Sequence, residues 1–367
     1  MGSVVKPLAF FASRCLQPLA RQWARPGYFD AFDPAQIAPR SVALIACHWI
    51  GDTFWATQVL PALQRRFSQA EFSVITKPHA VDLWHGLLPP DHIVTAPEVV
   101  SDRRRERVSW SALKRKATVL RERKFDLAID LTGNPYSAYF TWALRPAVGL
   151  GFGGGALSWL YSLRVTDAAR EGRHLSERPF RVIEPLLGAQ APSAFAYALP
   201  LRPPPATCSF AEAAKESGLQ SKRLFMVVPG AGWPEKEWGA ENFAAVARDL
   251  SASGAELVIS GSAAQLPLLE KVAREAGGAC VSTAPVGRTV ALLQAAEGVL
   301  CNDSALGHLA AACGVRVAVI FTGATDPQWY APLGHPGKVV VFGKNAPVAQ
   351  VAAHMLGREI RPVEAAT

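Results

Sequence analysis

Several motifs that define common enzyme classes are missing from this sequence. It contains no metal-holding D-x-D pattern, no G-x-x-x-x-G-K-[ST] phosphate loop and no G-x-S-x-G nucleophile elbow. Its 6 cysteines include no C-x-x-C pair, so the sequence indicates no zinc site. The sequence therefore contains none of these recognised motifs for holding a metal, a phosphate group or a catalytic nucleophile.

Long apolar runs are also missing. No segment has the roughly 18 uninterrupted apolar residues of a transmembrane helix. The start of the chain has a short apolar run but lacks the charged beginning and the cleavage site of a secretory signal. We predict a helical N-terminal extension over residues 1–40, packed on the protein or lying on a membrane surface. Cys47, Cys280 and Cys301 fall in or beside apolar runs, which favours a reduced, cytoplasmic protein. Such a protein could be free in the cytoplasm or peripheral to the inner face of the cytoplasmic membrane.

Positive charge is concentrated in one segment. The formal net charge is +8, and residues 102–124 hold ten Lys or Arg against three acidic residues. One interpretation is a solvated helix face, with Val108, Trp110, Leu113, Val119 and Leu120 on the buried side. The other is a patch that attracts phospholipid headgroups or a phosphorylated glycolipid. Nucleic acid is not expected, because no aromatic stacking platform accompanies the charge.

Apolar runs alternate with helical stretches from about residue 41 onward, and a proline cluster interrupts them near residues 199–207. Continuous Val, Ile, Leu and Ala runs are typical of parallel strands covered on both faces. The predicted strands are 41–47, 71–76, 92–94, 125–131, one near 148, 224–229, 256–260, 279–282, 298–301 and 316–321. The predicted helices are 53–66, 240–250, 265–276, 289–296 and one from 305.

We therefore predict an α/β protein with two Rossmann-like, doubly wound parallel-sheet domains facing a cleft. The predicted boundaries are residues 41–197 for the first domain, 198–222 for a Pro-rich linker, 223–345 for the second domain and 346–367 for a C-terminal helix and tail. Ligands of such sheets bind outside the carboxyl ends of the strands, so the loops that follow the strands are the candidate sites.

The first of these loops contains Gly51 and Asp52 at the start of a helix. Asp52 could cap that helix by accepting hydrogen bonds from its free backbone N–H groups. Alternatively, its carboxylate accepts a proton from an attacking hydroxyl group, and the helix N-terminus favours the charged form that a base needs.

The loop after residues 224–229 reads PGAGWPEKEW. Gly230 and Gly232 form a turn whose backbone N–H groups can meet a phosphate, and Lys236 adds a positive charge. The alternative is a solvent-exposed loop in which Trp233 and Trp238 pack on the core.

The stretch CNDSALGHLAAACGV has the same strand-to-helix arrangement. Asp303 or Ser304 could cap the helix, and His308 would lie one turn beyond Ser304. Further along, Thr325 and Asp326 follow another strand and can line the same crevice. The glycine-rich run 149–155 is a weak dinucleotide motif, because no acidic residue ends a strand about 20 positions later.

Five segments together resemble glycosyltransferase family 9, the bacterial heptosyltransferase family of lipopolysaccharide core assembly. They are IGDTFWATQVLPALQRRFSQAEFSVIT, FDLAIDLTGNPYSA, HLSERPFRVIEPLLG, VVPGAGWPEKEWGAENFAAVARDL and CNDSALGHLAAACGVRVAVIFTGATDP, in order between residues 41 and 335. The resemblance implies a GT-B fold, with the acceptor on the first domain and the nucleotide-sugar donor on the second. It also implies an inverting, metal-independent transfer of a heptose or related sugar from an ADP-activated donor to a lipopolysaccharide core or similar glycan.

The resemblance also implies residue roles. Asp52 takes the place of the family's catalytic base, Lys236 that of the lysine on the donor diphosphate, and Asp303 that of the aspartate on the donor sugar. The remaining donor-side residues would be Gly230, Gly232, Trp233, Ser304, Ala305, Gly307, His308, Thr325 and Asp326. The acceptor-side residues would be Gly51, Thr53 and Asn134.

Two departures from the family pattern concern specificity. Ala305 stands where the family commonly has glycine, which bears on the choice of sugar or nucleotide. His48, Phe54 and Trp55 are bulkier than the usual residues around the base, which bears on the acceptor. Two alternative functions stay open: a nucleotide-sugar 2-epimerase, which needs more acid/base residues, and a non-catalytic protein that binds a glycan or a nucleotide-sugar.

Overall fold

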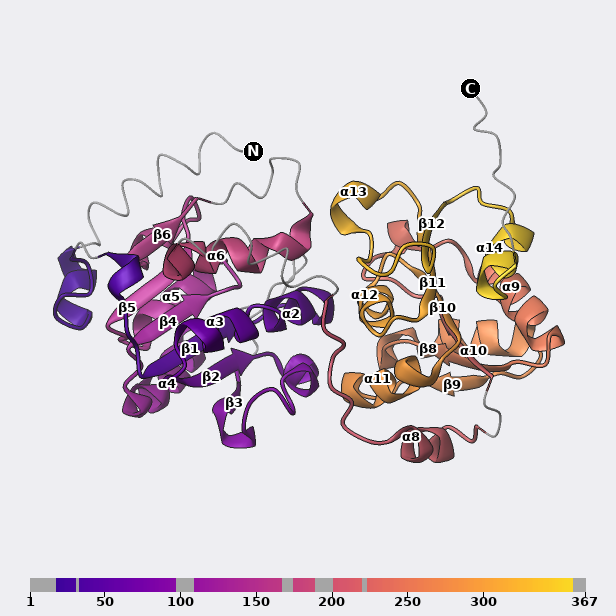
Figure 1. Cartoon of the computed structure of the whole chain (residues 1–367), viewed down its shortest axis with the longest axis horizontal. Helices are drawn as coiled ribbons and strands as arrows, with labels where there is room; N and C mark the ends of the chain where they lie inside the picture. Colours follow the sequence, from indigo (N-terminus) through magenta and orange to yellow (C-terminus); the bar gives the residue numbers. More distant parts are fainter. Residues whose placement is uncertain are drawn as a thin grey trace, which may run out of the picture. The chain divides into compact units, whose positions relative to one another are not determined.

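The computed structural model describes residues 18–30, 33–96, 109–166, 174–188, 201–219 and 223–358. The chain divides into two compact units, Met1–Leu199 and Pro200–Thr367. Each unit is an α/β domain built on a six-stranded sheet (Figure 1). The predicted fold class is confirmed in both.

The first domain follows the expected alternation of strands and helices. Its elements are β1 Ser41–Ala46, α2 Ile50–Thr57, α3 Leu60–Arg66, β2 Glu71–Thr76, β3 Ile93–Thr95, α4 Trp110–Leu120, β4 Leu127–Asp130, α5 Pro135–Ala143, β5 Val148–Phe152, β6 Leu163–Val165 and α6 Arg178–Leu187. The helix predicted over 53–66 is two helices, α2 and α3. Pro61 lies in the first turn of α3 and has no N–H to continue α2, so the chain turns at Gln58 and Val59 and starts again.

The second domain repeats the pattern. Its elements are α8 Phe210–Glu216, β7 Leu224–Val228, α9 Ala240–Ala252, β8 Glu256–Ser260, α10 Leu266–Glu275, β9 Cys280–Ser282, α11 Val286–Ala295, β10 Gly298–Asn302, α12 Ala305–Ala312, β11 Arg316–Phe321, α13 Pro327–Tyr330, β12 Val339–Gly343 and α14 Val348–Met355. The edge strands β6 and β12 are absent from the sequence prediction.

Both sheets have the same strand order. In the first domain it is β3-β2-β1-β4-β5-β6, and in the second it is β9-β8-β7-β10-β11-β12. The pairs β1 with β2 and β7 with β8 are parallel, as are β1 with β4 and β7 with β10. This is the doubly wound order 3-2-1-4-5-6, in which the winding reverses between the first and fourth strands.

Each sheet is covered by helices on both faces. In the first domain, Ala43 and Ile45 of β1 share a core cluster with Leu113 of α4 and Phe140 of α5. Helices α3 and α6 contact each other, and α6 packs on β4 and β5. In the second domain, α9, α10 and α14 bury their apolar faces on one side of the sheet, while α12 packs on β10 and β11. Among the described residues, no helix combines the length and the apolar character needed to cross a bilayer.

The predicted linker and the predicted N-terminal extension both contain residues that pack on a domain. The segment predicted as a linker over 198–222 contains α8, which packs on α11 of the second domain. The backbone N–H of Thr207 donates to Gly287 O at 3.2 Å, which fastens the proline-rich stretch to the same domain. In the N-terminal extension, Tyr28 is buried and its hydroxyl donates to Leu160 O at 2.9 Å. The described part of that extension therefore packs on the first domain.

Candidate functional site

Most of the loops selected from the sequence follow the strands that flank the two reversal points. In the first domain these are the loops after β1 and β4, and in the second the loops after β7 and β10. A crevice forms at such a point because neighbouring connections leave in opposite directions. The loop with Thr325 and Asp326 follows β11, the neighbour of β10.

Asp52 lies in the first turn of α2, and its carboxylate is not a helix cap. The N-cap position belongs to Trp49, whose side chain makes no capping hydrogen bond. Asp52 is half-buried, and within the described parts of the chain its carboxylate has no hydrogen bond or ion pair. The capping alternative is therefore wrong. The carboxylate lies at the end of α2 where the backbone N–H groups are free of intrahelical hydrogen bonds.

Of the three bulky residues singled out near Asp52, two are buried. Phe54 and Trp55 are buried in the core, and the His48 ring contacts Leu131 O at 2.8 Å. The exposed large side chain of this loop is Trp49, which the sequence analysis did not select. Phe54 and Trp55 are therefore core residues, and the Trp55 ring lies edge-on to the His174 ring, with 5.9 Å between centroids.

The other acceptor-side residues also have structural roles. Gly51 is half-buried beside Asp52, and Thr53 is buried, with a hydroxyl group that has no hydrogen-bond partner among the described residues. Asn134 caps α5, since its side-chain oxygen accepts from the backbone N–H groups of Tyr136 at 3.0 Å and Ser137 at 2.9 Å. The cap places Asn134 at the carboxyl end of β4, next to the loop that carries Asp52.

A buried network joins the loops after β1 and β4. The Thr132 hydroxyl accepts from Cys47 N at 2.9 Å and donates to Ile45 O at 3.1 Å. Asp130 Oδ1 accepts from Thr132 N at 2.7 Å, and Asp130 Oδ2 accepts from the Tyr161 hydroxyl at 2.5 Å. The network fixes the backbone from which α2 starts.

Asp130 and Tyr161 titrate abnormally because they are buried. Desolvation raises the pKa of the Asp130 carboxyl, and the hydrogen bonds that it accepts offset part of that rise. Desolvation, together with the nearby Asp130 charge, raises the pKa of Tyr161 well above its ordinary value. Neither residue was selected from the sequence, because their contact spans 31 positions of the chain.

In the second domain, Asn302 holds the loops after β7 and β10 together. It is fully buried, and its amide group donates to Pro229 O at 2.7 Å. Its side-chain oxygen accepts from Trp238 N at 3.0 Å. Asn302 therefore fixes both ends of the loop that contains Lys236.

Lys236, Asp303 and Thr325 meet at the centre of the candidate donor site. Lys236 Nζ lies 2.5 Å from Asp303 Oδ2, and the Thr325 hydroxyl donates to the same oxygen at 2.6 Å. The side chains of Lys236 and Asp303 are only 9% and 6% exposed. Three loops, after β7, β10 and β11, thus converge on one carboxylate oxygen, while Asp303 Oδ1 makes no hydrogen bond within the described residues.

Two aromatic rings flank the Lys236 ammonium group. Its Nζ lies 4.2 Å from the centre of the Trp233 ring and 5.5 Å from that of Tyr330. Trp233 is exposed, so the expectation that it packs on the core is wrong, whereas Trp238 is buried as expected. Tyr330, in α13, was not selected from the sequence.

The capping alternative is also wrong for Asp303 and Ser304. Asp303 bonds Lys236 and Thr325, and Ser304 occupies the N-cap of α12 without making a capping hydrogen bond. The Ser304 hydroxyl is buried and has no hydrogen-bond partner among the described residues. Ala305 follows it, half-buried, and His308 lies buried one turn further along α12.

The remaining donor-side residues shape the backbone. A Cβ atom at Gly307 would lie 2.8 Å from Cys301 Sγ, so glycine lets α12 approach β10 closely. A Cβ at Gly230 would meet the Gln265 side chain at 2.3 Å, whereas Gly232 has open space around it. Asp326 caps the short helix α13 by accepting from Gln328 N at 2.9 Å.

The basic segment is described only from residue 109, and residues 102–108 lie outside the described parts. Leu113 and Leu120 of α4 are buried as predicted, but Trp110 and Val119 are exposed. Arg121 and Arg123 donate hydrogen bonds to carbonyl groups of the first domain, Ala143 O and Asp91 O. The exposed charges of this part are Lys114, Arg115, Glu122, Arg123 and Lys124.

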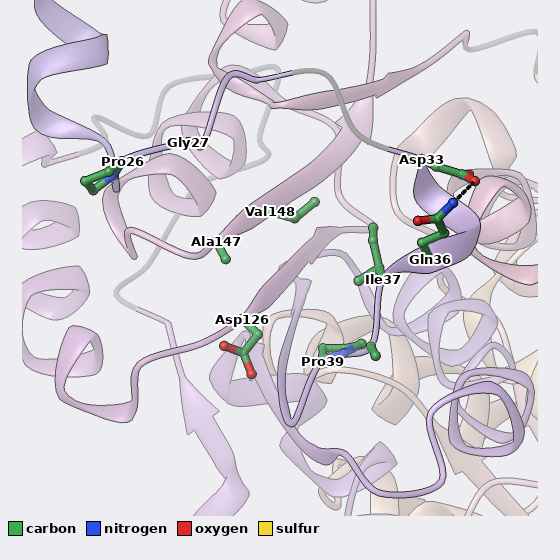
Figure 2. A pocket seen from close by; sticks show the side chains of 10 residues that line it. Pro26, Gly27, Asp33, Gln36, Ile37, Pro39, Asp126, Ala147 and Val148 are labelled. Carbon is green, nitrogen blue, oxygen red and sulfur yellow. Dashed lines mark hydrogen bonds between the residues drawn. The ribbon is translucent and has the colours of Figure 1, made fainter.

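A hollow of about 570 Å³ lies on the first domain, at the end of the sheet where the strands begin (Figure 2). Its walls include Pro39, Asp126 and Val148, which lie at the amino ends of strands. Its carboxylates are used locally: Asp126 Oδ2 accepts from Arg40 N at 2.9 Å, and Asp33 bonds Gln36 at 3.1 Å. This hollow therefore lies away from the loops at the carboxyl ends and has no part in the candidate site.

The model of glycosyltransferase family 9 (heptosyltransferase) matches residues 112–354 of this chain, which is more than half of it. The chain belongs to this family. The match includes Lys236, Asp303 and Thr325 but begins after Asp52.

Known relatives agree with this family assignment. Lipopolysaccharide heptosyltransferase 2 of Salmonella typhimurium is 32% identical over 131 residues, which cover 33% of this family-9 chain and 37% of that protein. The alignment therefore spans little more than a third of the curated relative.

Solved structures establish the fold over a longer stretch. The structure of Escherichia coli ADP-heptose lps heptosyltransferase II matches with a TM-score of 0.71 and 21% identity, covering 86% of this chain and 98% of that one. Escherichia coli heptosyltransferase WaaC with ADP matches with a TM-score of 0.60 and 19% identity, over 85% of this chain and 95% of that one. The fold is GT-B, as the sequence resemblance implied.

Proposed function

We propose that this chain is an inverting glycosyltransferase that moves a heptose, or a related sugar, from an ADP-activated donor to a lipopolysaccharide core or similar glycan. The observation that carries the proposal is the match to the family-9 model, which includes the convergence of Lys236, Asp303 and Thr325. The relatives named as lipopolysaccharide heptosyltransferases and the structure named with ADP support the choice of substrates.

In the proposed reaction, Asp52 is the general base. A hydroxyl group of the acceptor attacks the anomeric carbon of the donor sugar and transfers its proton to the Asp52 carboxylate. The new bond joins the acceptor oxygen to that carbon, while the bond from the carbon to the diphosphate oxygen breaks and ADP leaves. Attack from the face opposite the diphosphate inverts the anomeric configuration.

Donor binding is assigned to the second domain. The Lys236 ammonium group and the free N–H groups at the start of α12 stabilise the negative charge that develops on the departing diphosphate. Asp303 Oδ1 accepts a hydrogen bond from a hydroxyl group of the donor sugar. Because these groups supply the positive charge, the proposed transfer requires no metal and no cofactor beyond the donor itself.

The acceptor is proposed to be a phosphorylated glycolipid at the inner face of the cytoplasmic membrane. The basic segment 102–124 would attract its phosphates and the surrounding anionic lipids. The free thiols of Cys47 and Cys301 are typical of a reducing compartment such as the cytoplasm. Salt-sensitive co-sedimentation with vesicles that contain anionic lipid tests the surface contact, and the absence of co-sedimentation at low salt would contradict it.

The experiment that tests the function measures ADP release from ADP-heptose with and without truncated lipopolysaccharide. We expect release that depends on the acceptor, a product with inverted anomeric configuration, and the same rate in EDTA. Interconversion of the donor without acceptor would instead identify an epimerase, and binding without turnover would identify a non-catalytic protein. A rate abolished by EDTA and restored by a divalent cation would refute the metal-free mechanism.

A further inference from the structure

The loop that carries Asp52 also presents an exposed aromatic side chain. Trp49 is the N-cap residue of α2, and 55% of its surface is exposed, although its neighbours Phe54 and Trp55 are buried. An isolated exposed tryptophan on a protein surface needs no functional explanation. Trp49, however, is held in place by two side chains from the adjacent loop.

Those side chains come from the loop after β2. The His79 ring stacks on the Trp49 ring with 5.6 Å between centroids and an interplanar angle of 22°. Lys77 Nζ lies 4.8 Å from the centre of the same ring. Strands β1 and β2 are parallel, with Ala46 opposite Thr76, so both loops leave the sheet at the same height. The indole ring is therefore oriented before any ligand arrives, which lowers the entropy cost of binding.

The charge of this group of three side chains is positive. Lys77 is 6% exposed and lies against the indole ring. Desolvation by burial and the Lys77 charge lower the pKa of His79, and its hydrogen bond with the His48 backbone offsets part of that shift. His79 is accordingly neutral near pH 7, and the charge is that of Lys77.

The group formed by Trp49, His79 and Lys77 lies near Asp52 in the chain. Trp49 and Asp52 are three residues apart, and Thr53 N donates to Trp49 O at 2.9 Å, which is the first helical turn of α2. Trp49 has extended backbone dihedrals as the N-cap, and Asp52 lies in the first turn, so both side chains belong to the same end of α2. A sugar ring on Trp49 would therefore lie at the end of α2 that carries Asp52.

We propose that Trp49, supported by His79 and Lys77, is the platform on which the acceptor sugar stacks, and that it selects a sugar carrying an anionic group. The C–H face of a pyranose ring lies on the exposed part of the indole, whose π face is electron-rich. Lys77 supplies the positive charge that attracts a phosphate or carboxylate group on that sugar or its neighbour. This inference rests on the proposed function, because it takes Asp52 as the base.

The test uses the full chain and two probes, a phosphorylated core oligosaccharide and the same oligosaccharide after phosphatase treatment. Calorimetry measures the binding of both without donor, and transfer assays measure the KM of the acceptor and of the donor. The variants are Trp49→Ala, Trp49→Phe and Lys77→Gln. The matched control is Trp23→Ala, because Trp23 is also an exposed tryptophan of this domain (58%) with a lysine, Lys114, over its ring at 5.8 Å.

We expect Trp49→Ala to weaken binding of both oligosaccharides roughly tenfold, the loss typical of an aromatic contact residue, with Trp49→Phe retaining most of it. Lys77→Gln should weaken binding of the charged probe several-fold. If phosphatase treatment of the wild-type probe has the same effect, the anionic group is a phosphate; if it has none, the group is a carboxylate. The control and the donor KM should stay within twofold of wild type.

The platform is refuted if Trp49→Ala binds and transfers like wild type, or if it raises the donor KM as much as the acceptor KM. Binding that depends on Trp49, in a protein that releases no ADP, would leave the platform in place and refute the proposed function. If Trp49→Ala transfers the sugar at the wild-type rate and with the wild-type acceptor KM, the proposed function stands and the platform is refuted.

Discussion

Replacing Lys236 with methionine removes the ammonium group that faces Asp303 and leaves most of the side-chain volume. The two charged groups lie 2.5 Å apart, and both side chains are less than a tenth exposed. In the variant, the Asp303 carboxylate keeps Thr325 as a hydrogen-bond donor at 2.6 Å but loses the cation that lies against it.

The expected cost follows from that burial. Removing one partner of a buried ion pair destabilises a protein by about 3–5 kcal/mol, because the other charge stays behind without compensation. For a domain of this size, about 1 kcal/mol corresponds to roughly 2–4 °C in Tm, so Lys236→Met should lower the transition of the second domain by roughly 6–20 °C. Asp303→Asn should also destabilise, and the double variant should lose less than the sum of the two.

Differential scanning calorimetry of the wild type, the two single variants and the double variant completes the cycle. We expect a coupling free energy of about 2–3 kcal/mol, near the upper end for residues in one network. Additive losses, with a coupling energy near zero, would refute the buried pair.

Three further predictions test the supporting structure. Asp130→Asn should flatten the dependence of the free energy of unfolding on pH. Because burial raises the pKa of Asp130, the folded state binds the proton more tightly than the unfolded state, and wild-type stability falls as pH rises above the unfolded pKa of about 4. Denaturant unfolding at several pH values measures this, and an unchanged slope in the variant would contradict it. Gly151→Ala should lower the free energy of unfolding by about 1–3 kcal/mol, because a Cβ atom there would lie 2.4 Å from the Tyr161 ring. Gly155 has open space around it, so Gly155→Ala should leave stability unchanged. Equal melting temperatures for the two variants would count against the close packing of Gly151 on Tyr161. Thr132→Val should lower kcat and leave the donor KM unchanged, because it removes the hydrogen bond of 2.9 Å from Cys47 N to the Thr132 hydroxyl, which holds the loop before α2. A rise in donor KM instead would argue against this positioning role of Thr132.

Much of the fold could be predicted because parallel strands buried on both faces consist almost wholly of apolar residues. The strands 71–76, 256–260 and 316–321 were predicted with the bounds that the structure shows. Edge strands β6 and β12 were missed, since β6 has only three residues and one of them is Arg164.

Roles that depend on distant partners could not be predicted. An aspartate at the start of a helix has the same local sequence whether it caps the helix or pairs elsewhere, and Asp303 pairs with a lysine 67 positions away. The glycine-rich run likewise has a steric explanation that the sequence does not contain. A Cβ at Gly149 would meet the Tyr28 ring, and one at Gly151 would meet that of Tyr161.

Acceptor-dependent release of ADP by Asp52→Asn tests the central proposal most directly, with Asp91→Asn as the matched control. Asp91 is an exposed aspartate of the same domain, outside the loops at the carboxyl ends of the strands. The proposal predicts that Asp52→Asn lowers kcat by about 10²–10⁴, as expected for the loss of a general base, with the donor KM unchanged and Asp91→Asn equal to wild type. A wild-type rate in Asp52→Asn, or no acceptor-dependent release by the wild type, would contradict it.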